Sequence, residues 1–143
     1  MFQYRRLCFL SISLLLLFTL CKGVYAQTLY PVNAGDKAKY AAIIEMPKAY
    51  LSGICLLYHD SDNKINGSLF NEFGISALDF TYDENKDKVK LHHVIKMMNK
   101  WYIKKVLRRD LRELIHQLRT GNGSYTNERF HLRYQFTPIE TNE

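Results

Sequence analysis

The sequence predicts an α+β protein in which a curved antiparallel sheet packs on one long amphipathic helix. Two observations support this class. Residues 39–95 consist of short segments of mostly alternating apolar and polar residues, separated by polar turns. One stretch of helical periodicity follows, over residues 99–121, and a last alternating segment comes after it. Because short turns join neighbouring strands, we expect an antiparallel sheet with one buried face.

Residues 1–26 have the layout of an export signal. Arg5 and Arg6 supply positive charge, a long apolar run follows, and Ala26 ends a small-x-small cleavage site. The apolar run is shorter than the roughly 20 residues of a bilayer-spanning helix. We therefore expect cleavage after Ala26 and a periplasmic or secreted protein. A retained anchor is one alternative. Lipid attachment at Cys21 is another, although the residues before it lack the small residue of a bacterial lipobox.

The mature chain, residues 27–143, has the length of a single domain. Its net charge is only mildly positive, because three of the cations behind the total of +6 lie in the signal. Nucleic-acid binding does not follow from so small an excess. Cys55 is the one cysteine outside the signal, which excludes an internal disulfide. Its apolar neighbours predict a buried thiol, with a reactive thiol or an intermolecular disulfide as alternatives.

Five strands are predicted before the helix, as a first strand followed by two hairpins. They cover residues 39–46, 50–58, 65–73, 76–82 and 88–95. In the second hairpin the alternation predicts one buried face and one wet face. The residues expected on the buried face are Leu78, Phe80, Tyr82, Val89, Leu91, His93 and Ile95.

The helix is expected to begin after Asn99, as N-cap, and to end at Gly121, as C-cap. We expect Trp101 in the core, with an anchor at the helix edge as the alternative. The last strand is predicted over residues 129–136, with Phe130 facing inward. The apolar stripe of the helix consists of Ile103, Val106, Leu107, Leu111, Leu114, Ile115 and Leu118.

No cluster of residues predicts catalysis, a metal site or a cofactor. The chain has five histidines, and the adjacent pair His92 and His93 would point to opposite faces of a strand. A nucleophile elbow, a glycine-rich phosphate loop and a zinc-protease motif are all missing from the sequence. We therefore expect a protein that is not an enzyme. A metal site built from distant histidines and a small hydrolase remain alternatives.

Three segments carry a resemblance to a known family. They are Tyr-Leu-Ser-Gly-Ile-Cys-Leu-Leu at residues 50–57, Ile-Asn-Gly-Ser-Leu-Phe-Asn-Glu-Phe-Gly-Ile at 65–75, and Leu-Asp-Phe-Thr-Tyr at 78–82. The pattern resembles lipoprotein-carrier-like proteins, the relatives of the LolA and LolB localisation factors. The resemblance implies a half-open antiparallel barrel whose concave apolar face is covered by helix. It also implies binding or movement of acyl chains or lipidated proteins across the periplasm. This chain is shorter than the family, with fewer strands and one long helix.

Our preferred hypothesis is an exported, non-enzymatic protein that binds a hydrophobic or lipid ligand on the concave face of its sheet. The same residues would also suit an ordinary filled core. The predicted lining consists of Ile54, Leu56, Leu69, Leu78, Phe80, Leu91, Phe130 and Leu132.

The alternative is an interaction or assembly module of the cell envelope that acts through the basic outer face of the helix. Its partner would be a membrane surface or an envelope protein, and not nucleic acid. A merely solvated helix face is the simpler interpretation of the same charges. The contact residues of this hypothesis are Lys104, Arg108, Arg109 and Arg112.

Overall fold

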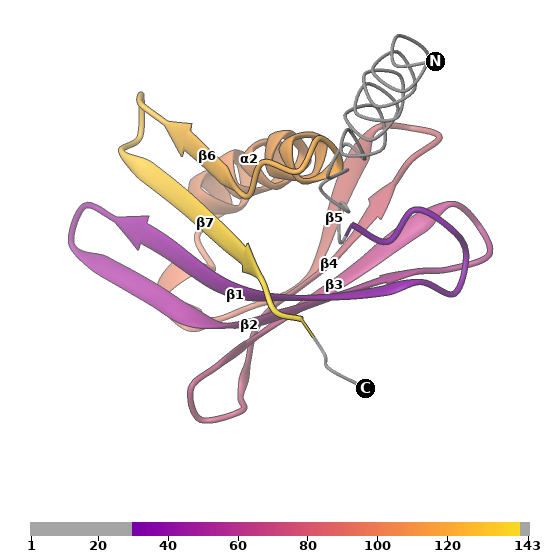
Figure 1. Ribbon diagram of the computed structural model, residues 1–143. Coiled ribbons are helices and arrows are strands. Elements are labelled where there is room, and N and C mark those ends of the chain that lie inside the picture. Colours follow the sequence, from indigo (N-terminus) through magenta and orange to yellow (C-terminus); the bar gives the residue numbers. More distant parts are fainter. Residues whose placement is uncertain (1–29, 141–143) are drawn as a thin grey trace, which may run out of the picture.

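The computed structural model describes residues 30–140, which form a seven-stranded antiparallel sheet and one α-helix (Figure 1). The predicted α+β class, with a curved sheet on a long helix, is confirmed. The predicted signal and Cys21 lie outside the described residues. The elements are β1 (Lys37–Met46), β2 (Ala49–His59), β3 (Lys64–Asn71), β4 (Ser76–Asp83), β5 (Lys88–Val94), the 3₁₀ turn η1 (Lys96–Met98), α2 (Trp101–Arg119), β6 (Ser124–Asn127) and β7 (Leu132–Pro138).

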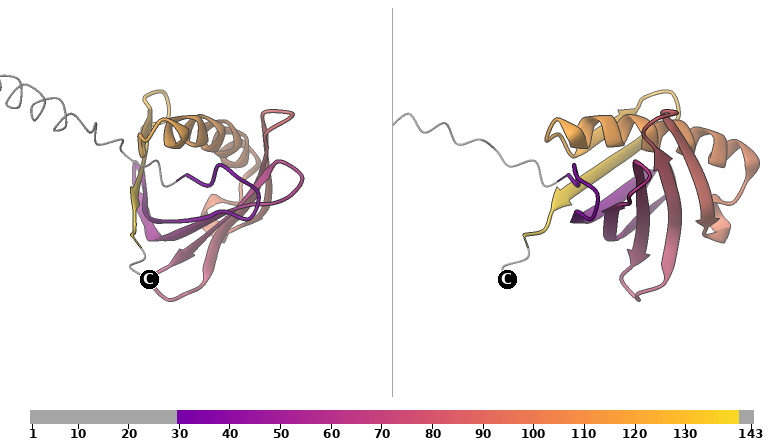
Figure 2. Two further views of the ribbon diagram at one scale, coloured as in Figure 1. Left: turned by 45° about the vertical axis from the view of Figure 1, so that its right-hand side comes forward. Right: turned by 90° about the vertical axis from the view of Figure 1, so that its right-hand side faces the viewer.

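The sheet curls so strongly that its two edges approach the same helix. The strand order is β5-β4-β3-β2-β1-β7-β6, and every neighbouring pair is antiparallel. Strand β7 returns to pair with β1, so that Ile44 lies opposite Tyr134. Helix α2 contacts the edge strands β5 and β6, and it covers the open side of the curl (Figure 2). The result is a half-barrel closed by one helix.

The core lies between the concave face of the sheet and the buried stripe of α2. Alternating residues of β1, such as Tyr40 and Ile44, are almost fully buried. From the helix, the buried apolar residues begin at Leu107 and continue to Leu118. Cys55 is fully buried, as predicted, and burial raises the pKa of its thiol to about 12. An unreactive, core-filling cysteine follows from this position.

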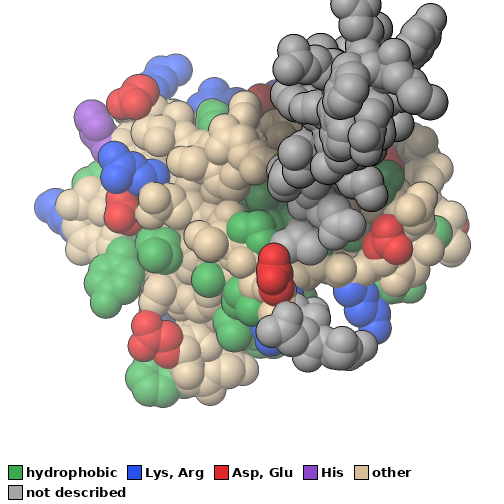
Figure 3. Space-filling model, in the orientation of Figure 1, with side chains coloured by type: hydrophobic (Ala, Val, Ile, Leu, Met, Phe, Trp, Pro, Cys, Tyr) green, Lys and Arg blue, Asp and Glu red, His purple; other side chains and the backbone are tan. Residues whose placement is uncertain are grey.

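The prediction that Ile54 and Leu56 face inward is wrong. Successive side chains of a strand point to opposite faces, and the structure buries Cys55 and Leu57 instead. Ile54 and Leu56 are therefore on the outer face, 40% and 44% exposed. Residues 54–57 are apolar on both faces, so their alternation does not specify which face is buried. Hydrophobic side chains reach the surface at several places in Figure 3.

A bulge between β4 and β5 corrects the predicted faces of β5. Asp79 pairs with His93, whereas the next residue, Phe80, pairs with Leu91. The extra residue on β5 reverses the alternation. His93 is consequently exposed and Val94 is buried, whereas His93 was expected on the buried face.

Both predicted caps of the helix are displaced. Lys100, rather than Asn99, is the N-cap residue, and it makes no side-chain cap hydrogen bond. Thr120 is the C-cap, and Gly121 follows it with a left-handed φ of 84°, a conformation that favours glycine. Trp101, expected in the core, is 76% exposed. With α2 beginning at Trp101, the first buried residue of the helix is Leu107, more than one turn later.

The C-terminal part contains a short strand, β6, that was not predicted. Its sequence, Ser-Tyr-Thr-Asn, is polar and only four residues long. The predicted last strand begins later than expected, because residues 129–131 form the turn from β6 to β7 and His131 has a left-handed φ of 52°. Phe130 therefore lies in this turn, 40% exposed, rather than on the inner face of a strand.

We expect Gly67→Ala to destabilise the fold. A Cβ at Gly67 would lie 2.2 Å from the ring of Phe80, which is only 3% exposed. Overpacking of this kind costs about 1–3 kcal/mol. Urea denaturation should show a lower free energy of unfolding, whereas the control Ser68→Ala, on the other face of β3, should change little. Equal midpoints for the two variants would contradict this account.

Candidate functional site

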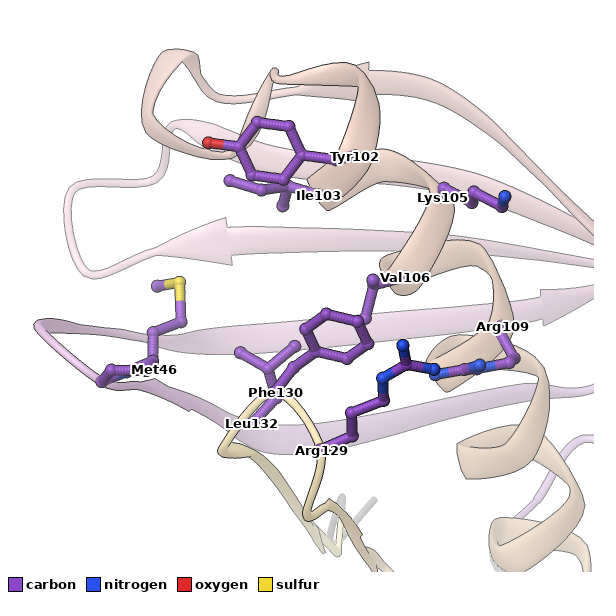
Figure 4. Close-up of a pocket in the computed structure, with 10 residues that line it drawn as sticks. Met46, Tyr102, Ile103, Lys105, Val106, Arg109, Arg129, Phe130 and Leu132 are labelled. Carbon is purple, nitrogen blue, oxygen red and sulfur yellow. The ribbon is translucent and has the colours of Figure 1, made fainter.

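A cavity of about 590 Å³ opens beside the N-terminal half of α2 (Figure 4). Small-molecule sites in proteins span about 300–1,000 Å³, so this cavity has the size of a ligand site. Its walls come from the β1–β2 turn, α2, the β6–β7 turn and the start of β7. The lining residues are Met46, Pro47, Tyr102, Ile103, Lys105, Val106, Arg109, Arg129, Phe130 and Leu132.

The cavity exists because the apolar stripe of α2 extends beyond the sheet that covers it. From Leu107 onward the stripe is buried, whereas Ile103 and Val106 are only partly buried. Beside these two residues lie the β1–β2 and β6–β7 turns and the ends of the strands that they join, and Figure 4 shows Met46 across the space from α2. This part of the apolar helix face is thus only partly covered by protein. Such a face favours an apolar ligand.

Positive charge borders this apolar space. Lys105 and Arg109 come from α2, and Arg129 comes from the β6–β7 turn. Figure 4 shows the guanidinium groups of Arg109 and Arg129 pointing toward each other. The Arg129 guanidinium also lies over the ring of Phe130, 5.5 Å from its centroid. One end of an apolar cavity therefore carries two converging cations.

A buried carboxylate next to Arg109 fastens the middle of α2 to the sheet. Asp110 is fully buried. The Asn127 side-chain amide donates to its two oxygens at 2.8 and 3.1 Å, and the Tyr134 hydroxyl donates at 3.0 Å. Burial is the largest influence on this carboxyl and raises its pKa, against the opposing effect of these hydrogen bonds. These bonds join α2 to β6 and β7.

A second polar cluster fastens the C-terminal end of α2. The Arg119 guanidinium lies 5.6 Å from the ring centroid of Tyr30 and 5.4 Å from that of Tyr82. Arg119 also forms an ion pair with Glu84, which follows β4. The β4–β5 hairpin and the residues before β1 are thus held against the end of the helix.

Asp87 adds a hydrogen-bonded link in the same cluster. Its carboxylate accepts from the Tyr82 hydroxyl at 2.8 Å and lies 2.8 Å from His116 Nε2 of α2. The hydrogen bond from Tyr82 is the main cause of its lowered pKa. The helix is thus held at its middle and at its C-terminal end, and the cavity lies beside its N-terminal half.

The histidines are dispersed over the structure. His59 is buried on the inner face of β2, where its Nδ1 lies 3.0 Å from the Pro31 carbonyl oxygen. His92 and His93 are exposed on β5. Within residues 30–140, no three His, Cys, Asp or Glu side chains lie together in a way that could hold a metal ion.

The structure divides the predicted ligand-binding residues among three places. Phe130 and Leu132 line the cavity. Ile54 and Leu56 face away from it, on the outer side of the sheet. The others belong to the filled core, either buried or, for the last of them, packed against it: Leu69, Leu78, Phe80 and Leu91.

The predicted basic contact residues also separate. Arg109 lines the cavity. The other three, Lys104, Arg108 and Arg112, follow one line along α2 at intervals of four residues. Arg112 is neutralised in part by Glu113, 3.0 Å away.

Most of the cavity was not predicted from the sequence. Ile103 and Val106 were assigned to the helix stripe, but nothing in the stripe shows where its cover ends. Arg129 and Met46 approach the helix only through turns that are distant from it in sequence. Pro47, which ends β1, was the one local sign of a turn here.

Comparison of the chain with protein-family models, curated proteins and solved structures finds no match. Over the described residues, no helix combines the length and apolar content needed to cross a membrane.

The raised pKa of Asp110 predicts a pH-dependent contribution to stability. Because the folded state disfavours ionisation here, the contribution is full below the unfolded pKa of about 3.9 and is lost as pH rises through the folded pKa. Asp110→Asn cannot titrate. The free energy of unfolding of the original protein minus that of the variant should therefore fall as pH rises from about 4 and then level off. Denaturation across a pH series measures this difference, and a rise with pH would refute it.

Proposed function

We propose that this chain is an exported, non-enzymatic protein that binds a hydrophobic ligand, namely the acyl chain of a lipid or lipidated protein. The cavity at the N-terminal half of α2 is the proposed site. The observation that carries the proposal is an open space of about 590 Å³ whose walls are mainly apolar side chains. The place of action is the cell envelope, to which the export pattern of residues 1–26 would direct the chain.

Burial of apolar surface supplies the driving force for this binding. Ile103, Val106 and Phe130 keep part of their surface exposed in the cavity. An acyl chain that covers them gains about 25 cal/mol for each Å² of apolar surface removed from water. The curled sheet with one covering helix is also the architecture that the resemblance to lipoprotein carriers implies.

The proposed ligand lies in the cavity at the N-terminal half of α2, and not along the concave inner face of the sheet. Leu69 and Leu78, expected to line the site, are fully buried among protein side chains. A chain could enter that region only by displacing the packed core. The residues that line the cavity, by contrast, are not among the buried core residues.

The composition of the cavity supports binding rather than catalysis. The part of its lining that residues 30–140 supply contains no Ser, Cys, His, Asp or Glu, the residues that most often serve as nucleophiles or general acids and bases. The ionisable groups it offers are mainly the cations of Lys105, Arg109 and Arg129, which can hold an anion.

Phe130→Ala should weaken binding of a neutral apolar dye such as N-phenylnaphthylamine by about tenfold, equivalent to about 1.4 kcal/mol. The reason is the loss of aromatic surface from the cavity wall. Titration followed by dye fluorescence measures the effect.

Tyr58→Ala is the matched control, because Tyr58 is an aromatic residue of similar exposure, 41% against 40%, on the outer face of β2. It should bind the dye as the original protein does. Equal losses in both variants, or no dye binding by the original protein, would refute the proposed site.

As a second candidate, we propose contact of α2 with an anionic membrane surface. Two observations favour it. Arg108 and Lys104 follow one line on the outer side of the helix, and Trp101 projects 76% exposed from its first turn. Exposed tryptophan and nearby cations suit the interface between acyl chains and headgroups.

Charge reversal tests the membrane hypothesis. Lys104→Glu with Arg108→Glu should remove most binding to phosphatidylglycerol vesicles, and binding of the original protein should fall with salt as the screening length shortens. Trp101 is the only tryptophan of the chain, so its emission reports the contact directly. Lys88→Glu with Lys90→Glu, the same change on β5, should bind normally. If the α2 variant binds the vesicles as the original protein does, this face of α2 is not the membrane contact.

A further inference from the structure

Within residues 30–140, the two arginines at the end of the cavity form no hydrogen-bonded ion pair with a carboxylate. The nearest carboxylate to Arg109 is that of Asp110, with Nε 3.9 Å from Oδ1, too far for a hydrogen bond. That carboxylate already accepts hydrogen bonds from Asn127 and Tyr134. Arg109 lines the cavity, and its guanidinium N–H groups donate no hydrogen bond to residues 30–140.

Arg129 is equally unneutralised. Among residues 30–140, no carboxylate lies within 4.0 Å of its guanidinium group, although Glu128 is its neighbour in sequence. Its one described side-chain interaction is with the ring of Phe130. Stacking on a ring leaves the N–H groups in the guanidinium plane free to donate.

Figure 4 shows the two guanidinium groups pointing toward each other, and an anion between them would be attracted by both. A carboxylate is the group that guanidinium donors match best, through paired, charge-assisted hydrogen bonds. The adjoining walls, formed by Ile103, Val106 and Leu132, offer no partner for a second polar group. The arrangement therefore suits a molecule with one charged end and one apolar end.

We propose that Arg109 and Arg129 form a headgroup subsite, and that the ligand of this cavity is a single-chain amphiphile with a carboxylate head, a fatty acid. This inference rests on the proposed function and adds the chemical class of the ligand to it. The carboxylate lies between the two guanidinium groups, and the chain runs along the apolar wall of α2 toward Met46. A neutral amphiphile of the same length lacks these hydrogen bonds and binds more weakly.

Competition against N-phenylnaphthylamine, a neutral dye, tests the subsite. Dodecanoate should displace the dye from the original protein at a concentration at least about tenfold lower than dodecanol, because charge-assisted hydrogen bonds are retained only by the acid. In Arg109→Gln with Arg129→Gln the ratio of the two displacing concentrations should fall to about one, whatever the change in dye affinity. Circular dichroism checks that the exposed substitutions leave the fold intact.

Lys104→Gln with Arg108→Gln removes the same charge from α2 outside the cavity and should keep the preference for the acid. Equal affinity for acid and alcohol in the original protein, or a preference retained by the Arg109 and Arg129 variant, would overturn the headgroup subsite. Dye binding would still stand in both cases, and so would the proposed function. If the dye, the acid and the alcohol all fail to bind, the headgroup subsite and the proposed function are both refuted.

Discussion

The position of α2 across the open side of the sheet is the constraint on which the rest of this structure depends. A sheet that curls this far exposes the apolar face of its strands unless something closes it. The buried carboxylate of Asp110 ties the helix to β6 and β7 through Asn127 and Tyr134. These bonds add a side-chain link between the helix and β6, a strand that also pairs with β7.

The same attachment determines where the protein can bind something. The helix is tied at its middle by Asp110 and at its C-terminal end by the cluster around Arg119, whereas its first turns extend past the sheet. Its apolar stripe is therefore covered over most of its length and only partly covered at Ile103 and Val106. Because Asp110 directly follows Arg109, the bond that fixes the helix also fixes a cation at the cavity. Scaffold and proposed site are thus built from adjacent residues.

Several features of the fold can be predicted from local sequence patterns. Where a prediction was wrong, the structure shows the cause. The strands β1 to β5 and the helix were predicted because alternation and helical periodicity are local properties. The predicted buried face of β2 was wrong because residues 54–57 are all apolar. The pattern there does not show which alternate residues face the core. The face of His93 was wrong because a bulge adds one residue to β5, which local alternation does not reveal. Strand β6 is too short and polar to stand out.

The sequence by itself determined the α+β class, the single covering helix, the burial of Cys55 and the apolar stripe that reaches Ile103. Each of these depends on the order of residues within one segment, where periodicity and propensity act. Only the tertiary structure decided which part of that stripe is left partly covered and which cations border it. Those outcomes depend on where the β1–β2 and β6–β7 turns meet the helix, because segments far apart in sequence are placed together by strand pairing and by the Asp110 hydrogen bonds.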